Sequence, residues 1–249
     1  MKEKMKKELC ALGLLLKSVP ALTFSLFIIS VFSMNLLANK SLAVPFEWLA
    51  LDCGILFSWL TFMTMDILTK HFGPKAATQL SVVAILINLI LCLMFFIGSR
   101  IPGVWGESYV PGNEDVINTA LNHTFGGTWY ILAGSTTAFL VSAVVNNFSN
   151  YAVSKCFKKH PDGFFPYLCR TYISTALGQF VDNLVFALLV SHVFFGWSLL
   201  QCITCALTGM AAELLCEFLF SYFGFRICKK WEKAQVGKEY FDYLKQTEV

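Results

Sequence analysis

The sequence predicts an all-α, polytopic membrane protein with six transmembrane helices, and three observations support this fold class. First, 56% of the 249 residues are hydrophobic and only 14% are charged, a balance that no soluble domain of this size needs. Second, the apolar residues gather in stretches of about 20 residues or more, the length that crosses a bilayer. Third, lysine and arginine concentrate in alternate connecting segments.

Three spans are expected before the longest polar segment. The first runs from about Leu12 to Leu37, and Pro20 either kinks it or marks its true start. The second runs from about Phe46 to Thr69, and the third from about Ala77 to Gly98. Between these two, residues 70–77 contain a Gly-Pro pair that predicts a short turn.

Residues 99–128 are too polar to cross a membrane, because they contain two prolines, five glycines and three acidic residues. We expect an extracytoplasmic loop here, with a short surface helix from Asp115 to His123 that ends near FGGT (125–128). Three further spans and two turns complete the membrane part: spans at about Trp129–Val153, Arg170–Phe195 and Trp197–Cys228, a basic turn at 155–163 and a tight turn at Gly196.

The distribution of basic residues predicts that both chain ends are cytoplasmic. With the lysine-rich N-terminus inside, the outer segments hold only Lys40 and Arg100 as basic residues. Residues 1–230 then form a single six-helix domain, and residues 231–249 form a charged, partly helical cytoplasmic tail. Three spans, a long loop and three more spans also suggest two three-helix halves of opposite orientation, as in transporters built from inverted repeats.

The most informative stretch is RTYISTALGQFVDNLVF, residues 170–186, which is apolar except for a polar stripe. Asp182 lies deep in it, and a carboxyl group within a membrane span is by default functional. Arg170, Ser174 and Asp182 lie near one helical face, and Gln179 is one turn from Thr175. This stripe predicts a pathway, a binding site or a helix–helix contact.

Two more carboxyl groups, Glu213 and Glu217, lie one turn apart on the last span. In a low-dielectric site they repel each other, so one should hold a proton or both should meet a cation. The alternative is that they form hydrogen bonds between helices. Asp66 lies near the inner membrane surface. It would either pair with Lys70 or Lys75 at the end of its helix, or form a gating ion pair with Arg170. The alternative for Arg170 is that its side chain extends to the lipid headgroups.

Amide side chains in the spans can recognise a ligand, because an amide offers both a donor and an acceptor. Asn35 and Asn146 are such candidates alongside Gln179, although amides also hold helices together. No nucleotide-binding glycine loop and no hydrolase or metalloprotease motif is present, so we expect no enzyme activity and no cofactor. Cys202 and Cys205 form a CxxC without histidines nearby, which favours membrane-core packing over a metal or redox site.

Four patches resemble the queuosine-precursor transporter family, also called the vitamin uptake transporter family. They are SMNLLANK (33–40), MDILTKHFGPKAA (65–77), FGGTWYILAGSTTAFLVSA (125–143) and, most specifically, residues 170–186 with their Arg-Thr, Ser-Thr, Gln and Asp positions. Three residues depart from the family pattern: Lys70 stands where the family has Glu, Phe72 where it has Tyr, and Asn146 where it has Asp.

The resemblance implies a six-helix importer in the bacterial cell membrane, without an ATPase of its own. Its ligand would be a 7-deazaguanine: 7-cyano-7-deazaguanine, 7-aminomethyl-7-deazaguanine or queuine, used for tRNA queuosine. The expected partners are this small molecule and the lipid bilayer, with no nucleic acid, and a homodimer is left open. The alternatives are a substrate-binding membrane subunit of an energy-coupling-factor-type vitamin importer, and a non-transporting membrane enzyme or scaffold.

Overall fold

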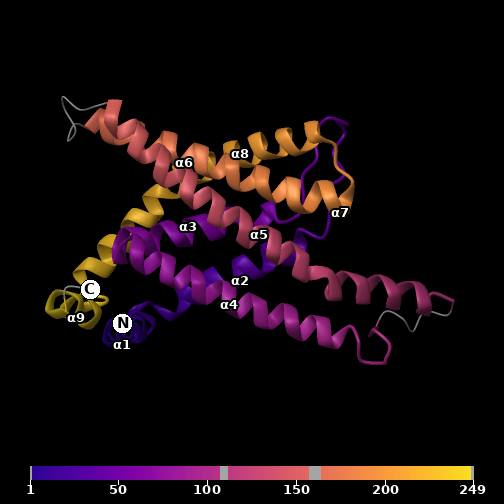
Figure 1. Ribbon diagram of the computed structural model, residues 1–249, viewed down its shortest axis with the longest axis horizontal. Coiled ribbons are helices and arrows are strands. Elements are labelled where there is room, and N and C mark those ends of the chain that lie inside the picture. The colour runs from indigo at the N-terminus through magenta and orange to yellow at the C-terminus, as the bar shows by residue number, and fades with distance from the viewer. Residues whose placement is uncertain (1, 107–111, 157–163, 248–249) are drawn as a thin grey trace. The chain divides into compact units, whose positions relative to one another are not determined.

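The computed structural model describes residues 2–106, 112–156 and 164–247, and within these ranges every regular element is a helix (Figure 1). The all-α prediction is therefore confirmed. The elements are α1 (Lys2–Ser18), α2 (Ala21–Leu37), α3 (Ile55–Phe72), α4 (Pro74–Gly98), α5 (Glu114–Cys156), α6 (Phe164–Phe186), a π-helical segment (Ala187–His192), α7 (Val193–Phe195), α8 (Leu199–Lys233) and α9 (Lys238–Thr247).

Four described stretches are long and apolar enough to cross a membrane: Pro74–Gly98, Glu114–Asn146, Tyr172–Phe195 and Leu199–Phe220. A fifth is added if α1 and α2 count together as one broken span. These helices suit a multi-pass membrane protein. The sixth crossing and the cytoplasmic position of both termini stay predictions.

The first two expected spans begin later than the sequence indicated. Residues 12–18 belong to α1, which is bent by 102° from α2, so they do not continue into the span. Pro20 directly precedes α2, where its missing N–H costs no helical hydrogen bond, and thus marks the true start. The second helix begins at Ile55 rather than near Phe46, because residues 38–54 are held by non-helical bonds such as Cys53 N–H to Lys40 O (2.8 Å).

The long polar loop is shorter than expected. Helix α5 begins at Glu114 and runs without a break for 43 residues, so the predicted surface helix Asp115–His123 is simply its first part. The sequence predicted that this short helix ends near Gly126 and Gly127, but both glycines lie inside α5. Gly126 instead allows a close approach, since a Cβ there would lie 2.5 Å from Ser99 Oγ.

The remaining turns agree with the sequence. Gly73 has a φ of 90° and alone separates α3 from α4, as the Gly-Pro pair predicted. Gly196 has a φ of 71° and ends α7 in the left-handed conformation that favours glycine. Helix α6 begins at Phe164, before the expected Arg170, and residues 157–163 of the expected basic turn lie outside the described residues.

The chain forms two compact units that interleave along the sequence. Unit 1 contains Met1–Ser33, Phe57–Asn88 and Cys216–Val249, and unit 2 contains Met34–Leu56 and Leu89–Leu215. The units therefore do not coincide with the first and second three-helix halves, and the inverted repeat stays a hypothesis.

The core of unit 1 includes the C-terminal segment that the sequence predicted to be a tail. Trp231 and Tyr240 are buried with Leu15, Leu68 and Leu80 in one apolar cluster. The segment is helical at α9, as expected, but it packs on α1 rather than extending away from it. Burial of the Tyr240 ring explains the docking of α9, because a large ring removes much apolar area from water for so short a helix.

Candidate functional site

Helices α5 and α6 of unit 2 pack along each other in opposite directions, and small residues allow the close approach (Figure 1). Gly134 of α5 lies against Val190, and further along α5 Asn146 lies against Gly178 of α6. Between these contacts Ser142 meets Asp182. Residues one or two turns apart on α5 thus contact residues the same number of turns apart on α6 and on the π-helical segment that follows it. This is the regular register of an antiparallel helix pair.

Asp182 and Asn183 each link α6 to a neighbouring helix. Ser142 Oγ of α5 donates to Asp182 Oδ1 at 2.9 Å. Asn183 Nδ2 donates to Glu213 Oε2 of α8 at 3.2 Å. Gly209, one turn before Glu213, makes room for this bond, because a Cβ there would lie 2.9 Å from Asn183 Nδ2. Three helices therefore meet around two carboxyl groups.

Two amide oxygens extend this group of polar residues. Gln179 lies one turn before Asp182 and Asn183 on α6, and Asn146 lies one turn after Ser142 on α5. Asn146 Oδ1 and Gln179 Oε1 are buried and have no hydrogen-bond partner among the residues that the structure describes. We call the set of six residues the three-helix polar cluster: Ser142, Asn146, Gln179, Asp182, Asn183 and Glu213.

The three-helix polar cluster contains more hydrogen-bond acceptors than donors. Glu213 is only 5% exposed, and its carboxyl group lies within electrostatic reach of that of Asp182. Two neighbouring carboxyl groups favour a bound proton, a cation or a ligand that presents several N–H groups. The amide oxygens of Asn146 and Gln179 add two more acceptors, which also favour a ligand with several N–H groups.

The family model described as putative vitamin uptake transporter matches residues 52–227, well over half of the chain. The chain belongs to this family. The matched region contains all six residues of the three-helix polar cluster. Neither a curated protein nor a solved structure matches the chain. The family assignment agrees with the predicted vitamin uptake transporter, and with a transport rather than an enzymatic function.

Five of the six predicted binding residues lie in unit 2, and four of them, Asn146, Gln179, Asp182 and Glu213, belong to the three-helix polar cluster. Ser174 is 2% exposed and lies on the same α6 row as Asp182, and Thr175 follows it. Asn35 is buried near the end of α2 with an unpartnered Nδ2, but no hydrogen bond joins it to the cluster.

The two residues of the predicted gating ion pair belong to different units, Asp66 to unit 1 and Arg170 to unit 2. Asp66 lies on α3 in unit 1, within electrostatic reach of Lys70. The ion pair of Lys75 is with Glu8 instead, since Lys75 Nζ lies 2.8 Å from Glu8 Oε1. The side chains of Arg170 and Glu217 lie outside the described residues, although their backbones belong to α6 and α8. The Arg170–Asp66 pair and the Glu213–Glu217 pair stay predictions.

The CxxC cysteines pack as apolar residues. Cys202 is fully buried with Ala187 and Trp197, and Cys205 packs against this group. Within residues 2–106, 112–156 and 164–247, no group of three or more His, Cys, Asp or Glu side chains could hold a metal ion. These contacts agree with the core-packing interpretation of the pair.

Sequence reasoning missed Asn183, Gly178 and Gly209 as parts of the site. Asn183 directly follows Asp182, so a second polar residue beside a membrane carboxyl group was an available signal. The glycines act through close helix contact, and a single sequence does not say which glycine faces a neighbouring helix.

Proposed function

We propose that this protein imports queuosine precursors for tRNA queuosine salvage, as a secondary carrier of 7-deazaguanine compounds. The ligand class comprises 7-cyano-7-deazaguanine, 7-aminomethyl-7-deazaguanine and queuine. Membership of the vitamin uptake transporter family supports uptake of a small nutrient molecule. The four sequence patches, above all residues 170–186, support this particular ligand class.

The acceptor excess of the three-helix polar cluster is the observation that carries the proposal. A guanine-like edge presents adjacent N–H groups, and a carboxylate can accept two of them at once. Asp182 or Glu213 would bind this edge, while the free oxygens of Asn146 and Gln179 would accept from the remaining N–H groups. The aminomethyl form is a cation, which two nearby carboxyl groups also favour.

The other predicted residues would complete the path of the ligand. Asn35 has an unpartnered amide nitrogen and could donate to a ligand carbonyl. Ser174 and Thr175 would line the α6 face on the way to Gln179. Arg170 and Asp66 would form a gating ion pair.

We further propose six crossings with both termini in the cytoplasm of a bacterial cell, arranged as a single membrane domain. The crossings would be α2, α3, α4, α5, α6 with its continuation to Phe195, and α8. Helix α3 has 18 residues and is about 27 Å long, close to the thickness of the bilayer core. The charge distribution supports the orientation.

The function is tested in a host that lacks both its own precursor synthesis and its own importer. The chain is expressed there, each of the three precursors is supplied at low concentration, and queuosine is measured in the tRNA. Restoration with at least one precursor is the expected result. No restoration with any precursor, while the protein is present in the membrane fraction, would contradict the proposal.

A second candidate is the substrate-binding subunit of an energy-coupling-factor-type vitamin importer. The family description, which speaks of vitamin uptake, favours it over other classes. The two candidates differ in their need for a partner. Uptake by the purified chain alone in proteoliposomes supports the secondary carrier, whereas uptake only after addition of an ATP-driven module supports the subunit.

A further inference from the structure

Helix α1 presents an exposed apolar stripe, formed by Met5, Leu9 and Leu16. Met5 is 60% exposed, Leu9 is 62% exposed and Leu16 is 37% exposed. Their spacing of four and seven residues places them on one face of the helix. Leu12, which is partly buried, lies on the same face.

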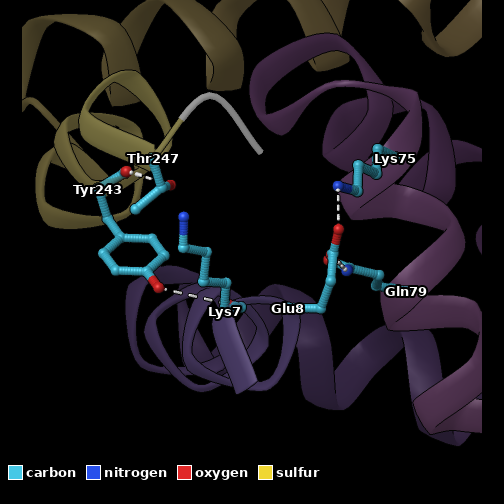
Figure 2. A network of polar contacts seen from close by, with 6 residues as sticks. All are labelled: Lys7, Glu8, Lys75, Gln79, Tyr243 and Thr247. Carbon is cyan, nitrogen blue, oxygen red and sulfur yellow. Dashed lines mark hydrogen bonds and ion pairs between the residues drawn. The ribbon is translucent and has the colours of Figure 1, made fainter. Parts of the chain in front are cut away.

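The neighbouring face of α1 is fixed within unit 1. Ala11 and Leu15 are buried in its core. Glu8 of α1 receives Lys75 Nζ at 2.8 Å and Gln79 Nε2 at 3.4 Å, both from α4 (Figure 2). On the other side, Tyr243 Oη of α9 donates to the backbone oxygen of Lys7 at 3.4 Å (Figure 2). These contacts hold α1 so that its apolar stripe points away from the core.

The 102° bend sets the direction of α1 relative to α2. Helix α2 has 17 residues without a charged side chain and is about 25 Å long. If α2 crosses the bilayer, α1 runs along the membrane surface instead of into it. Lys6 and Lys17 are exposed and lie beside the apolar stripe, each next to one of its residues.

We propose that α1 is an interfacial helix that embeds Met5, Leu9 and Leu16 in the membrane surface and binds anionic phospholipid headgroups through Lys6 and Lys17. A basic flank along an apolar stripe is the pattern of helices that lie in the headgroup region. The apolar stems of the lysines rest on the acyl chains while their ammonium groups reach phosphate. A protein partner is disfavoured, because the 102° bend places α1 at the membrane surface if α2 crosses the bilayer.

The depth of the stripe is tested on the full chain in lipid nanodiscs. A fluorescent amino acid replaces Leu9 in one sample and Glu3, exposed on another face of α1, in a second. The fluorophore at position 9 should be quenched by brominated acyl chains and protected from iodide. Its ratio of bromolipid quenching to iodide quenching should be at least about threefold higher than the same ratio at position 3. Equal ratios, or iodide quenching at position 9, would overturn the proposal and point to a surface for a protein partner.

The lipid preference is tested with the double variant Lys6→Gln and Lys17→Gln. Its binding of labelled phosphatidylglycerol, relative to phosphatidylcholine, should fall about fivefold for each lysine removed at low salt. The matched control, Lys238→Gln with Lys245→Gln, removes two exposed charges from α9 and should bind anionic lipid as the wild type does. Unchanged binding in the α1 variant would overturn the headgroup assignment, and this outcome is independent of the transport function.

Discussion

At the scale of single residues, the two carboxyl groups of the three-helix polar cluster are costly to keep within a membrane. Among the described side chains, each accepts one hydrogen bond from a neighbouring helix, Asp182 from Ser142 and Glu213 from Asn183. One donor satisfies only part of the acceptor capacity of a carboxylate. The remaining lone pairs would accept the N–H groups of the ligand in the function that we propose, a role beyond joining helices.

Replacing Asp182 with Asn should strongly reduce uptake while the protein still inserts. The amide keeps the size of the side chain and can still accept from Ser142, but it loses the charge that pairs with ligand N–H groups. We expect uptake to fall about 10- to 100-fold, the effect of losing a hydrogen bond to a charged group. Asp242→Asn on exposed α9 is the matched control and should retain uptake. Wild-type uptake by Asp182→Asn would remove Asp182 from the site.

Asp52 should make the stability of the protein depend on pH. It lies before α3, outside the membrane helices, and burial raises its pKa from 3.8 to about 6, although the Gly54 N–H opposes this at 2.7 Å. Because the folded pKa is the higher one, the folded state favours the protonated form. This contribution is complete below about pH 4 and is lost as pH rises through about 6.

The pH effect is measured by thermal unfolding in detergent between about pH 4 and pH 8. The melting temperature of the wild type should fall across this range more than that of Asp52→Asn. Parallel curves for the two proteins would show that Asp52 does not have a raised pKa in the folded state.

Residue types alone predicted most of the polar cluster. Asp182, Gln179, Asn146 and Glu213 were all selected because polar groups are rare in apolar spans, and the structure brings them together. Asn183 was missed because its role depends on a hydrogen bond to Glu213, which lies 30 positions away on another helix. The same limit left the partner of Asp66 open between Lys70 and Lys75.

At the scale of elements, proline and glycine affected the helices differently. Pro20 separates two helices, since proline removes a backbone donor and clashes with the preceding turn. The Gly126–Gly127 pair did not interrupt α5, because glycine only weakens a helix and neighbouring contacts can offset the cost. This difference explains why the sequence predicted the break at Pro20 and wrongly ended a helix near Gly126.

Gly134→Ala should destabilise the pairing of α5 and α6. A Cβ at this position would collide with Cγ2 of Val190, whose β-branched side chain has little freedom to move away. We expect a loss of about 1–3 kcal/mol, typical of overpacking, measured as a lower melting temperature in detergent. Gly98→Ala on α4 is the control, because nothing lies within 4 Å of its Cβ position. Equal melting temperatures in the two variants would contradict the tight α5–α6 contact.

At the scale of the whole molecule, the basic residues predict one orientation for six crossings. Reporters fused after Thr247 should be active only on the cytoplasmic side, and reporters inserted near Trp105 only on the outer side. Activity of both on the same side would require an even number of crossings among α5, α6 and α8. That result would contradict the six-span topology without affecting the local contacts of the polar cluster.

Ligand binding by the three-helix polar cluster is the central claim, and calorimetric titration of the purified chain tests it most directly. Wild-type protein in nanodiscs should bind at least one 7-deazaguanine precursor, and Glu213→Gln should weaken that binding about 10-fold or more. Glu239→Gln, on exposed α9, should bind as the wild type does. Equal affinity of wild type and Glu213→Gln would contradict the assignment of the site to this cluster.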